Sequence, residues 1–162
     1  IATSARFGGM FAGLPSHALD ALEAFGEDVG LAFQIADDIL DIASEAEISG
    51  KTPGTDLREG ILTLPMLLVL QAARDEDQEL RGLLGRALPD DRDHVRALEL
   101  MRAHPALKQA QSVARKYAED AIAQLAKVRS LSQGSGFAPA AQVDQVLVTL
   151  EKICRNTADR EV

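Results

Sequence analysis

The sequence predicts an all-α protein, and three of its features support this prediction. Of the 162 residues, 46% are hydrophobic but only 4% are aromatic, and the chain contains 12 Gly and 6 Pro. Alanine and leucine, which favour helices, are abundant, whereas strands draw on β-branched and aromatic residues. Apolar residues recur at three- and four-residue steps, which is the spacing of one helix face. A chain of this length can bury one sizeable core, so we expect residues 1–162 to form one domain or a large part of one.

A glycine and a proline separate the first two predicted helices. Residues 1–13 have the pattern of the end of a helix of small residues, which closes at Gly13 with Pro15 as a stop signal. Ser16 is placed to cap a long helix over 17–45, in which apolar residues follow a helical period.

Two glycines interrupt the middle of this long helix. Gly26 and Gly30 each cost about 1 kcal/mol relative to Ala in a helix interior. The close approach of a neighbour or ligand would offset that cost. The alternative is that the two positions are tolerated weak points.

The rest of the chain follows the same pattern after a break at 49–56, where two Gly and a Pro fall within eight residues. The apolar spacing predicts five further helices, at 62–73, 75–84, 93–102, 104–130 and 139–155. Pro65 fits the first turn of the first of these helices. Residues 133–136 are predicted to form a flexible linker, and the polar tail at 155–162 is predicted to fray.

The composition excludes several classes of function. The formal charge of −8 argues against a general nucleic-acid-binding protein, because neutralising backbone phosphates needs a basic face. Cys154 is the single cysteine, so we expect no internal disulfide framework, a core position for this residue, and a cytoplasmic protein. We expect no transmembrane segment, since no apolar run approaches the ~20 residues that a membrane span needs. The start of the chain has no signal-peptide pattern.

Three carboxylates and an amide lie along one side of the long predicted helix. Gln34, Asp37, Asp38 and Asp41 fall within an arc of roughly 100°. The rest of the helix surface there is apolar, with Ile35, Ala36, Ile39, Leu40 and Ile42. Acidic clusters are usually solvated faces, but ionised acids beside so many apolar groups favour a cavity or cleft. Carboxylates without His or Cys nearby suit Mg²⁺, which commonly takes phosphate oxygens as further ligands, so a phosphate or diphosphate substrate is the first hypothesis.

The segment after this helix adds groups that suit a phosphate. Lys51 supplies a compact positive charge, and Gly50 and Gly54 allow the backbone to approach a ligand closely. Asp56 is a candidate to hold metal-bound water. Each of these residues alone has a plain explanation as an exposed loop residue, but together with the carboxylates they predict a diphosphate site.

The combined pattern resembles a known family. Its three motifs, in order, are Phe33-Gln34-x-x-Asp37-Asp38-x-x-Asp41, Gly50-Lys51-x-x-Gly54-x-Asp56-Leu57 and Glu59-Gly60-x-x-Thr63-Leu64-Pro65. They are similar to the second aspartate-rich region of the trans-isoprenyl diphosphate synthases, or polyprenyl synthetases, which include the farnesyl, geranylgeranyl and longer-chain enzymes. The flanking helices match the carboxy-terminal half of that family in order and approximate length. The resemblance implies an all-α, isoprenoid-synthase-type helical bundle, here lacking its amino-terminal helices.

The resemblance also implies an activity, in which an allylic diphosphate condenses with isopentenyl diphosphate to give a linear trans-polyprenyl diphosphate. Mg²⁺ assists ionisation of the allylic diphosphate, and no catalytic residue is expected beyond the metal and diphosphate ligands. The implied site residues are Asp37 as a direct metal ligand, Asp38 and Asp41 as direct or water-mediated ones, Gln34 and Lys51 in contact with the allylic diphosphate, and Asp56 supporting metal-bound waters. A homodimer is implied as well.

Half of such a site is missing from the sequence. The first aspartate-rich motif and the basic residues that hold isopentenyl diphosphate are not found, and Ile61 stands where many relatives carry Lys. The chain starts without Met inside a helix-like stretch, so we expect a fragment that is inactive by itself. Two alternatives remain: a class I terpene cyclase, although its Asn-Asp-x-x-Ser-x-x-x-Glu motif does not occur, and a non-catalytic helical subunit of a prenyl synthase.

Other conspicuous residues receive simpler interpretations. His17, His94 and His104 lie too far apart in sequence to suggest a metal triad, and each is expected at the surface or as a helix cap. Phe7 and Phe11, at helical spacing, are expected to pack against helices absent from the chain. Their exposure would favour self-association.

Overall fold

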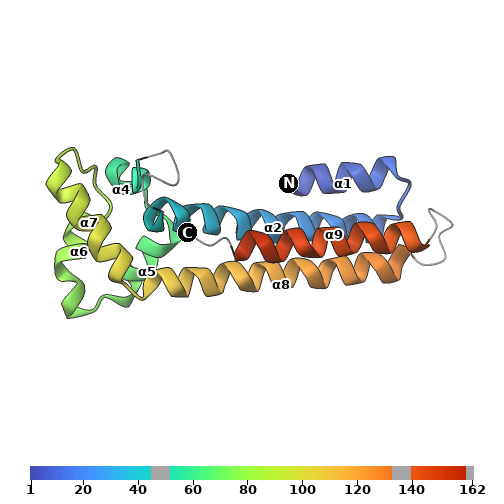
Figure 1. Ribbon diagram of the computed structural model, residues 1–162. Coiled ribbons are helices and arrows are strands. Elements are labelled where there is room, and N and C mark those ends of the chain that lie inside the picture. Colours follow the sequence, from blue (N-terminus) through green and yellow to red (C-terminus); the bar gives the residue numbers. More distant parts are fainter. Residues whose placement is uncertain (45–51, 133–139, 160–162) are drawn as a thin grey trace. The chain divides into compact units, whose positions relative to one another are not determined.

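The computed structural model describes residues 1–44, 52–132 and 140–159, and every regular element within these ranges is a helix (Figure 1). The elements are α1 (Ala2–Phe11), α2 (Ser16–Ala43), α4 (Thr55–Glu59), α5 (Leu64–Ala72), the 3₁₀ helix η1 (Asp75–Asp77), α6 (Gln78–Leu83), α7 (Asp91–Ala103), α8 (Ala106–Ser132) and α9 (Ala140–Ala158). The all-α fold predicted from the sequence is therefore confirmed.

The chain divides into two compact units, and α2 and α8 each contribute to both. The described residues of the first, which we call the bundle unit, are 1–34, 114–132 and 140–159. Those of the second, the carboxylate unit, are 35–44 and 52–113.

Small and aliphatic side chains form the core of the bundle unit, in which α2, α8 and α9 lie side by side (Figure 1). The buried members of this core are Phe25, Val29, Ala32, Ala118, Ala121, Leu125, Leu147, Cys154 and Ala158. Cys154 is fully buried, and burial raises the pKa of its thiol. A buried thiol with a raised pKa is a packing residue and not a reactive thiolate, as the sequence predicted.

The two glycines in α2 have different surroundings. A Cβ atom on Gly26 would lie 2.5 Å from the Cα of Ala2 in α1, so only a glycine permits this approach of the two helices. A Cβ on Gly30 would meet side-chain atoms of Ile1 at 3.8 Å or more, which is ordinary van der Waals contact. Close approach therefore explains Gly26, whereas Gly30 is a weak point.

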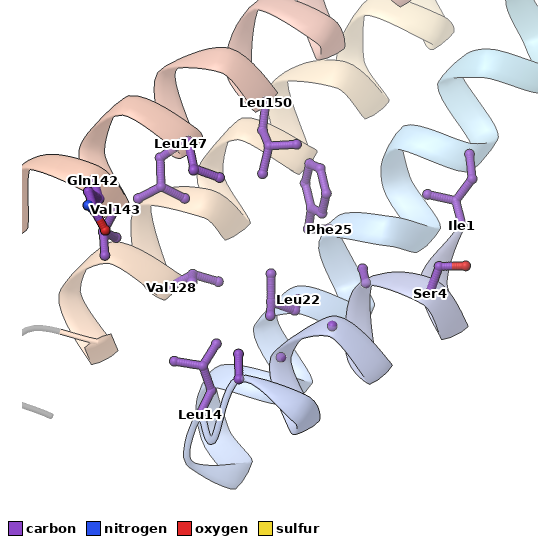
Figure 2. A pocket seen from close by; sticks show the side chains of 15 residues that line it. Ile1, Ser4, Leu14, Leu22, Phe25, Val128, Gln142, Val143, Leu147 and Leu150 are labelled. Carbon is purple, nitrogen blue, oxygen red and sulfur yellow. The ribbon is translucent and has the colours of Figure 1, made fainter. Parts of the chain in front are cut away.

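An apolar cavity of about 590 Å³ lies within the bundle unit (Figure 2). Its wall comes from α1, α2, α8, α9 and the turn between α1 and α2, and includes Leu14, Leu22, Phe25, Val128 and Leu147. None of the predicted metal and diphosphate site residues that the structure describes belongs to this wall. On α1, Phe7 and Phe11 are exposed, as expected, with 53% and 93% of their surface accessible.

The core of the carboxylate unit draws on the end of α2, on α4, α5, α6 and α7, and on the start of α8. Its buried members are Ile42, Leu57, Met66, Val69, Leu80, Leu84, Leu88, Ala97, Met101 and Ala106. Ile42 anchors the end of α2 in this core, and Leu57 anchors α4.

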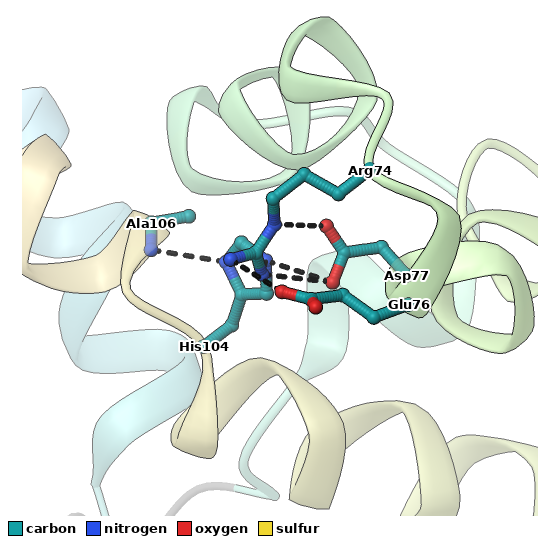
Figure 3. Close-up of polar contacts among 5 residues, drawn as sticks. All are labelled: Arg74, Glu76, Asp77, His104 and Ala106. Atoms are coloured by element: carbon teal, nitrogen blue, oxygen red, sulfur yellow. Dashed lines mark hydrogen bonds and ion pairs between the residues drawn. The ribbon is translucent and has the colours of Figure 1, made fainter.

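A partly buried polar cluster joins η1 to the start of α8 in the carboxylate unit (Figure 3). The guanidinium of Arg74 donates to both carboxylate oxygens of Asp77, at 2.8 and 2.9 Å, and lowers the pKa of that carboxyl. His104 Nε2 lies 3.2 Å from Asp77 Oδ1, and its Nδ1 accepts a hydrogen bond from the N–H of Ala106. The expected capping role of His104 is confirmed.

Several element boundaries differ from the sequence-based expectation. Helix α2 begins at Ser16 itself, because the carbonyl of Pro15 accepts the first helical hydrogen bonds, from Ala18 and Leu19. Helix α4 was not predicted. Helix α9 continues to Ala158, so the expected fraying from residue 155 is wrong up to that point.

Helix α7 also begins earlier than expected. Asp90 caps it by accepting a hydrogen bond from the N–H of Arg92 at 2.7 Å, so the helix starts at Asp91. The predicted linker at 133–136 and residues 49–51 of the predicted break at 49–56 lie outside the described residues.

Candidate metal and diphosphate site

The three predicted metal ligands lie near the end of α2. Asp37 is exposed, and Asp38 and Asp41 are partly exposed, while Ile35 and Ile42 on the same helix are buried. The acids thus border an apolar core without entering it, where an isolated carboxylate would be prohibitively unstable. Gln34 is also exposed on α2, and the predicted phosphate contact Lys51 lies outside the described residues.

The carboxylate of Asp41 holds the start of α4. Its Oδ1 accepts a hydrogen bond from the backbone N–H of Thr55, and its Oδ2 accepts one from that of Asp56, each at 3.2 Å. The carbonyl of Asp41 accepts a further bond from the N–H of Gly54 at 2.6 Å. Because N–H groups of a first helical turn have no partner within the helix, Asp41 satisfies donors that would otherwise need water. Segment 54–56 is therefore tied to the end of α2.

Negative charge accumulates around Asp56. Burial raises the pKa of its carboxyl, and the charges of Asp41, Asp38, Glu59 and Asp37 raise it further, in that order of strength. The three acids of the motif therefore all lie near enough to Asp56 to repel its charge. A divalent cation among these oxygens would relieve the repulsion.

The donor set fits a hard cation but does not enclose one. Among the residues that the structure describes, no three His, Cys, Asp or Glu side chains converge into a group that could hold a metal ion alone. Mg²⁺ usually keeps several waters and binds through one or two carboxylates together with phosphate oxygens. An open row of carboxylates is thus compatible with Mg²⁺ shared with a phosphate group and does not suit a metal held by protein ligands alone.

A histidine on α7, His94, contacts the turn that precedes α4. The Nε2 of His94 lies 2.9 Å from the carbonyl oxygen of Gly54, and its Nδ1 lies 3.1 Å from a guanidinium nitrogen of Arg58. Arg58 also donates to Asp91 at 2.8 Å. Since a carbonyl only accepts and a guanidinium only donates, the ring must carry its proton on Nε2.

The sequence predicted His94 at the surface or as a helix cap, and the surface position is wrong. The residue is 4% exposed and lies on the inner face of α7 with Ala97 and Met101, at helical spacing. That spacing was the available signal, because it places His94 in the apolar stripe of its helix.

Comparison with known proteins assigns the chain to a family. The sequence model that describes the family as "Polyprenyl synthetase" matches residues 1–101, a range that contains all the predicted site residues. The chain belongs to the polyprenyl synthetase family. Among its polyprenyl synthetase relatives is the nonaprenyl diphosphate synthase of Mycobacterium tuberculosis, which is 46% identical over 126 residues, or 78% of this chain.

Solved polyprenyl synthetase structures share the fold. The geranylgeranyl pyrophosphate synthase of Corynebacterium glutamicum, in complex with calcium and isoprenyl diphosphate, matches 98% of this chain with a TM-score of 0.77 and 34% identity. The polyprenyl synthase of Caulobacter crescentus, in complex with the same two ligands, matches 99% with a TM-score of 0.79 and 32% identity. The chain spans 38% of the mycobacterial protein and 45% of each of these two structures. Over the described residues, each helix is too short or too polar to cross a bilayer.

Proposed function

We propose that this chain is the carboxy-terminal part, residues 1–162, of a single polyprenyl synthetase domain whose complete form is a trans-polyprenyl diphosphate synthase. The reaction would condense an allylic diphosphate with isopentenyl diphosphate to give a linear product. The observation that carries the proposal is the row of carboxylates at the end of α2, with segment 54–56 tied to it, inside the range that matches the family.

We assign Mg²⁺ to this row of carboxylates. Asp37, Asp38 and Asp41 would hold the metal directly or through water, and Asp56 would hold metal-bound water. The surroundings of Asp56 support this assignment: burial raises the pKa of its carboxyl most, and four neighbouring acids raise it further, so a cation would neutralise this negative charge. When bound, the metal would stabilise the charge that develops on the departing diphosphate.

The chain's own residues would bind and orient the substrate. Gln34 and Lys51 are the proposed contacts to the allylic diphosphate. Asp41 has both carboxylate oxygens fixed by backbone N–H groups, so it presents its remaining lone pairs in a defined direction. None of these residues is assigned a proton transfer.

Two relatives support a diphosphate ligand and a divalent cation. The Corynebacterium and Caulobacter proteins were both solved with calcium and isoprenyl diphosphate. Calcium and magnesium are both hard cations that take oxygen ligands, although magnesium demands a tighter octahedral geometry. We therefore keep Mg²⁺ as the proposed physiological ion.

A homodimer is the proposed assembly. Ile1, Phe7, Met10 and Phe11 on and next to α1 are each more than half exposed, and large apolar side chains exposed in this way favour association. Sedimentation of the full-length protein tests the assembly, and a monomer at micromolar concentration would contradict it. Cytoplasmic location stays a prediction, which cell fractionation tests.

Turnover assays test the proposed activity. The full-length protein, supplied with Mg²⁺, an allylic diphosphate and labelled isopentenyl diphosphate, is expected to form labelled prenyl diphosphate. The 162-residue chain alone is expected to form none, since it lacks the first aspartate-rich motif. If the full-length protein shows no turnover with farnesyl or geranylgeranyl diphosphate as primer, the proposed activity is wrong. If the 162-residue chain alone turns over robustly, the expectation that it is inactive is wrong.

A further inference from the structure

Helix α7 reaches the carboxylate-bearing segment at two points. Near its end, Arg102 donates through Nε to the carbonyl of Ile42 at 2.8 Å and through a terminal nitrogen to that of Ser44 at 2.6 Å. These carbonyls belong to the last turn of α2 and to the residue that follows the helix, where a helix leaves its acceptors without partners. Near the start of α7, His94 contacts Gly54. One helix thus holds both the end of α2 and the turn that precedes α4.

The contact at Gly54 is buried and specific. The Gly54 carbonyl accepts two hydrogen bonds, from the backbone N–H of Arg58 at 3.0 Å and from Nε2 of His94 at 2.9 Å. The backbone of Gly54 has φ +71°, and a Cβ there would lie 2.9 Å from Nε2 and 3.0 Å from Leu98. The ring therefore lies directly against the backbone, at the one residue type that accommodates both the conformation and the contact.

The peptide that His94 holds is the one that orients Asp41. Gly54 donates its N–H to the carbonyl of Asp41, and the next two N–H groups, of Thr55 and Asp56, bind the two carboxylate oxygens of Asp41. A shift of the Gly54 peptide would move all three donors together. The orientation of the Asp41 carboxylate consequently depends on an imidazole to which it is not bonded.

We propose that His94 is a positioning residue for the metal and diphosphate site, acting on Asp41 through the Gly54 peptide. The inference rests on the function proposed above. Both ring nitrogens are already engaged, Nε2 with Gly54 and Nδ1 with Arg58, so His94 acts through geometry and not by proton transfer. Its substitution should weaken metal-dependent turnover while leaving the fold intact.

Two substitutions separate the contact from the packing of the ring. His94→Leu keeps a side chain of similar volume but removes the N–H that donates to the Gly54 carbonyl. His94→Gln places an amide N–H near the position of Nε2 and should restore the bond to Gly54. Arg92→Ala, on the same helix at a side chain that is 94% exposed, is the matched control.

Amide hydrogen exchange measures the contact without reference to activity. In His94→Leu, the amides of Gly54, Thr55 and Asp56 should exchange about tenfold faster, as expected when a buried hydrogen bond is lost. His94→Gln and Arg92→Ala should exchange close to the wild-type rate. Unchanged exchange in His94→Leu would overturn the proposed contact.

Kinetics of the full-length protein measure the consequence. His94→Leu should lower kcat by about 10- to 100-fold and raise the Mg²⁺ concentration for half-maximal rate, as for residues that support metal ligands, with His94→Gln recovering most of the loss. If wild-type and His94→Leu turn over alike, the positioning role is wrong while the proposed function stands. Absence of wild-type turnover would overturn the proposed function itself. If His94→Leu does not fold, His94→Asn, whose amide is too short to reach Gly54, replaces it in the comparison with His94→Gln.

Discussion

The pKa of Asp28 in the bundle unit and that of Asp56 in the carboxylate unit are both raised, although the two carboxyls have different neighbours. Burial is the largest cause that raises the pKa of either carboxyl. At Asp28, Lys116 and Lys127 act in the opposite direction and partly offset the neighbouring acids. At Asp56, the four described neighbours that affect the carboxyl most are all acidic. Lysines of the bundle unit therefore partly balance the charge around Asp28, whereas the described charges that act most on Asp56 are all negative and would be balanced by a cation.

Replacing one acid in each unit gives the largest expected difference. In the full-length protein, Asp37→Ala should lower kcat/KM by at least ~10²-fold, because it removes a proposed ligand of the metal that stabilises the departing diphosphate. Asp28→Ala, on the same helix, should stay within about twofold of wild type, as for substitutions away from a site. Steady-state turnover at saturating Mg²⁺ is the measurement. Equal losses in the two variants would remove the distinction between the units.

Two glycines with left-handed backbones allow a similar comparison of stability. Gly13 has φ +75° and no heavy atom within 4 Å of a Cβ, whereas the Cβ of an alanine at Gly54 would meet His94. Gly13→Ala should lower the free energy of unfolding by about 1–2 kcal/mol from backbone strain alone. Gly54→Ala adds the displaced contact and should cost about 1–3 kcal/mol more. Urea unfolding of the 162-residue chain measures both, and an equal cost would show that His94 can move without penalty.

Within the bundle unit, two alanine substitutions should have opposite signs. Gly26→Ala should destabilise by about 1–3 kcal/mol, because its Cβ would overlap the backbone of Ala2. Gly30→Ala should stabilise by up to about 1 kcal/mol, since it gains helix propensity and meets Ile1 only at ordinary contact distance. Thermal unfolding measures both. Stabilisation by Gly26→Ala would contradict the packing of α1 on α2.

The smallest expected effect concerns pH. Because the pKa of Asp56 is raised in the folded protein, its protonated form favours folding, and that contribution is lost as the pH rises through the folded-state value. Asp56→Asn should therefore stabilise the metal-free protein slightly at pH 7 and have little effect near pH 4. With Mg²⁺ and diphosphate present, the wild type should gain stability that this variant lacks.

Asp28→Asn is the control for that experiment. Its pKa is also raised, so it should show the same sign of pH dependence without metal. It should nevertheless keep the full stabilisation by Mg²⁺ and diphosphate. Thermal unfolding at pH 4 and pH 7, with and without these ligands, gives all four comparisons, and a ligand effect lost equally in both variants would contradict the assignment of Asp56.

Periodic features of the fold were predictable from the sequence, and single contacts between distant residues were not. The long helices follow from apolar spacing, and the position of Asp37, Asp38 and Asp41 on one of them follows from the same period. Helix α4 has five residues, too few for a period, and its first turn depends on Asp41, 14 and 15 positions earlier in the chain.

The role of His94 illustrates the same limit for the site. Its neighbour Gly54 is 40 positions away, so no local pattern could pair them. The apolar stripe of α7 could have shown that His94 is buried, but not which carbonyl it binds. Likewise, the repulsion at Asp56 arises because α4 brings this residue beside α2, which spacing within one helix cannot show.

Paramagnetic NMR of the full-length protein with Mn²⁺ and inorganic diphosphate tests the central claim most directly, because Mn²⁺ shares the oxygen ligands of Mg²⁺ and broadens signals near its binding site. We predict saturable broadening at the amides of Asp37, Asp38 and Asp56 that Mg²⁺ reverses, with weaker broadening at the amide of Asp28, which lies about 14 Å from that of Asp37 along α2. Broadening that is equal at Asp28 and Asp56, or absent from both, would contradict the claim that the carboxylate unit carries the metal site.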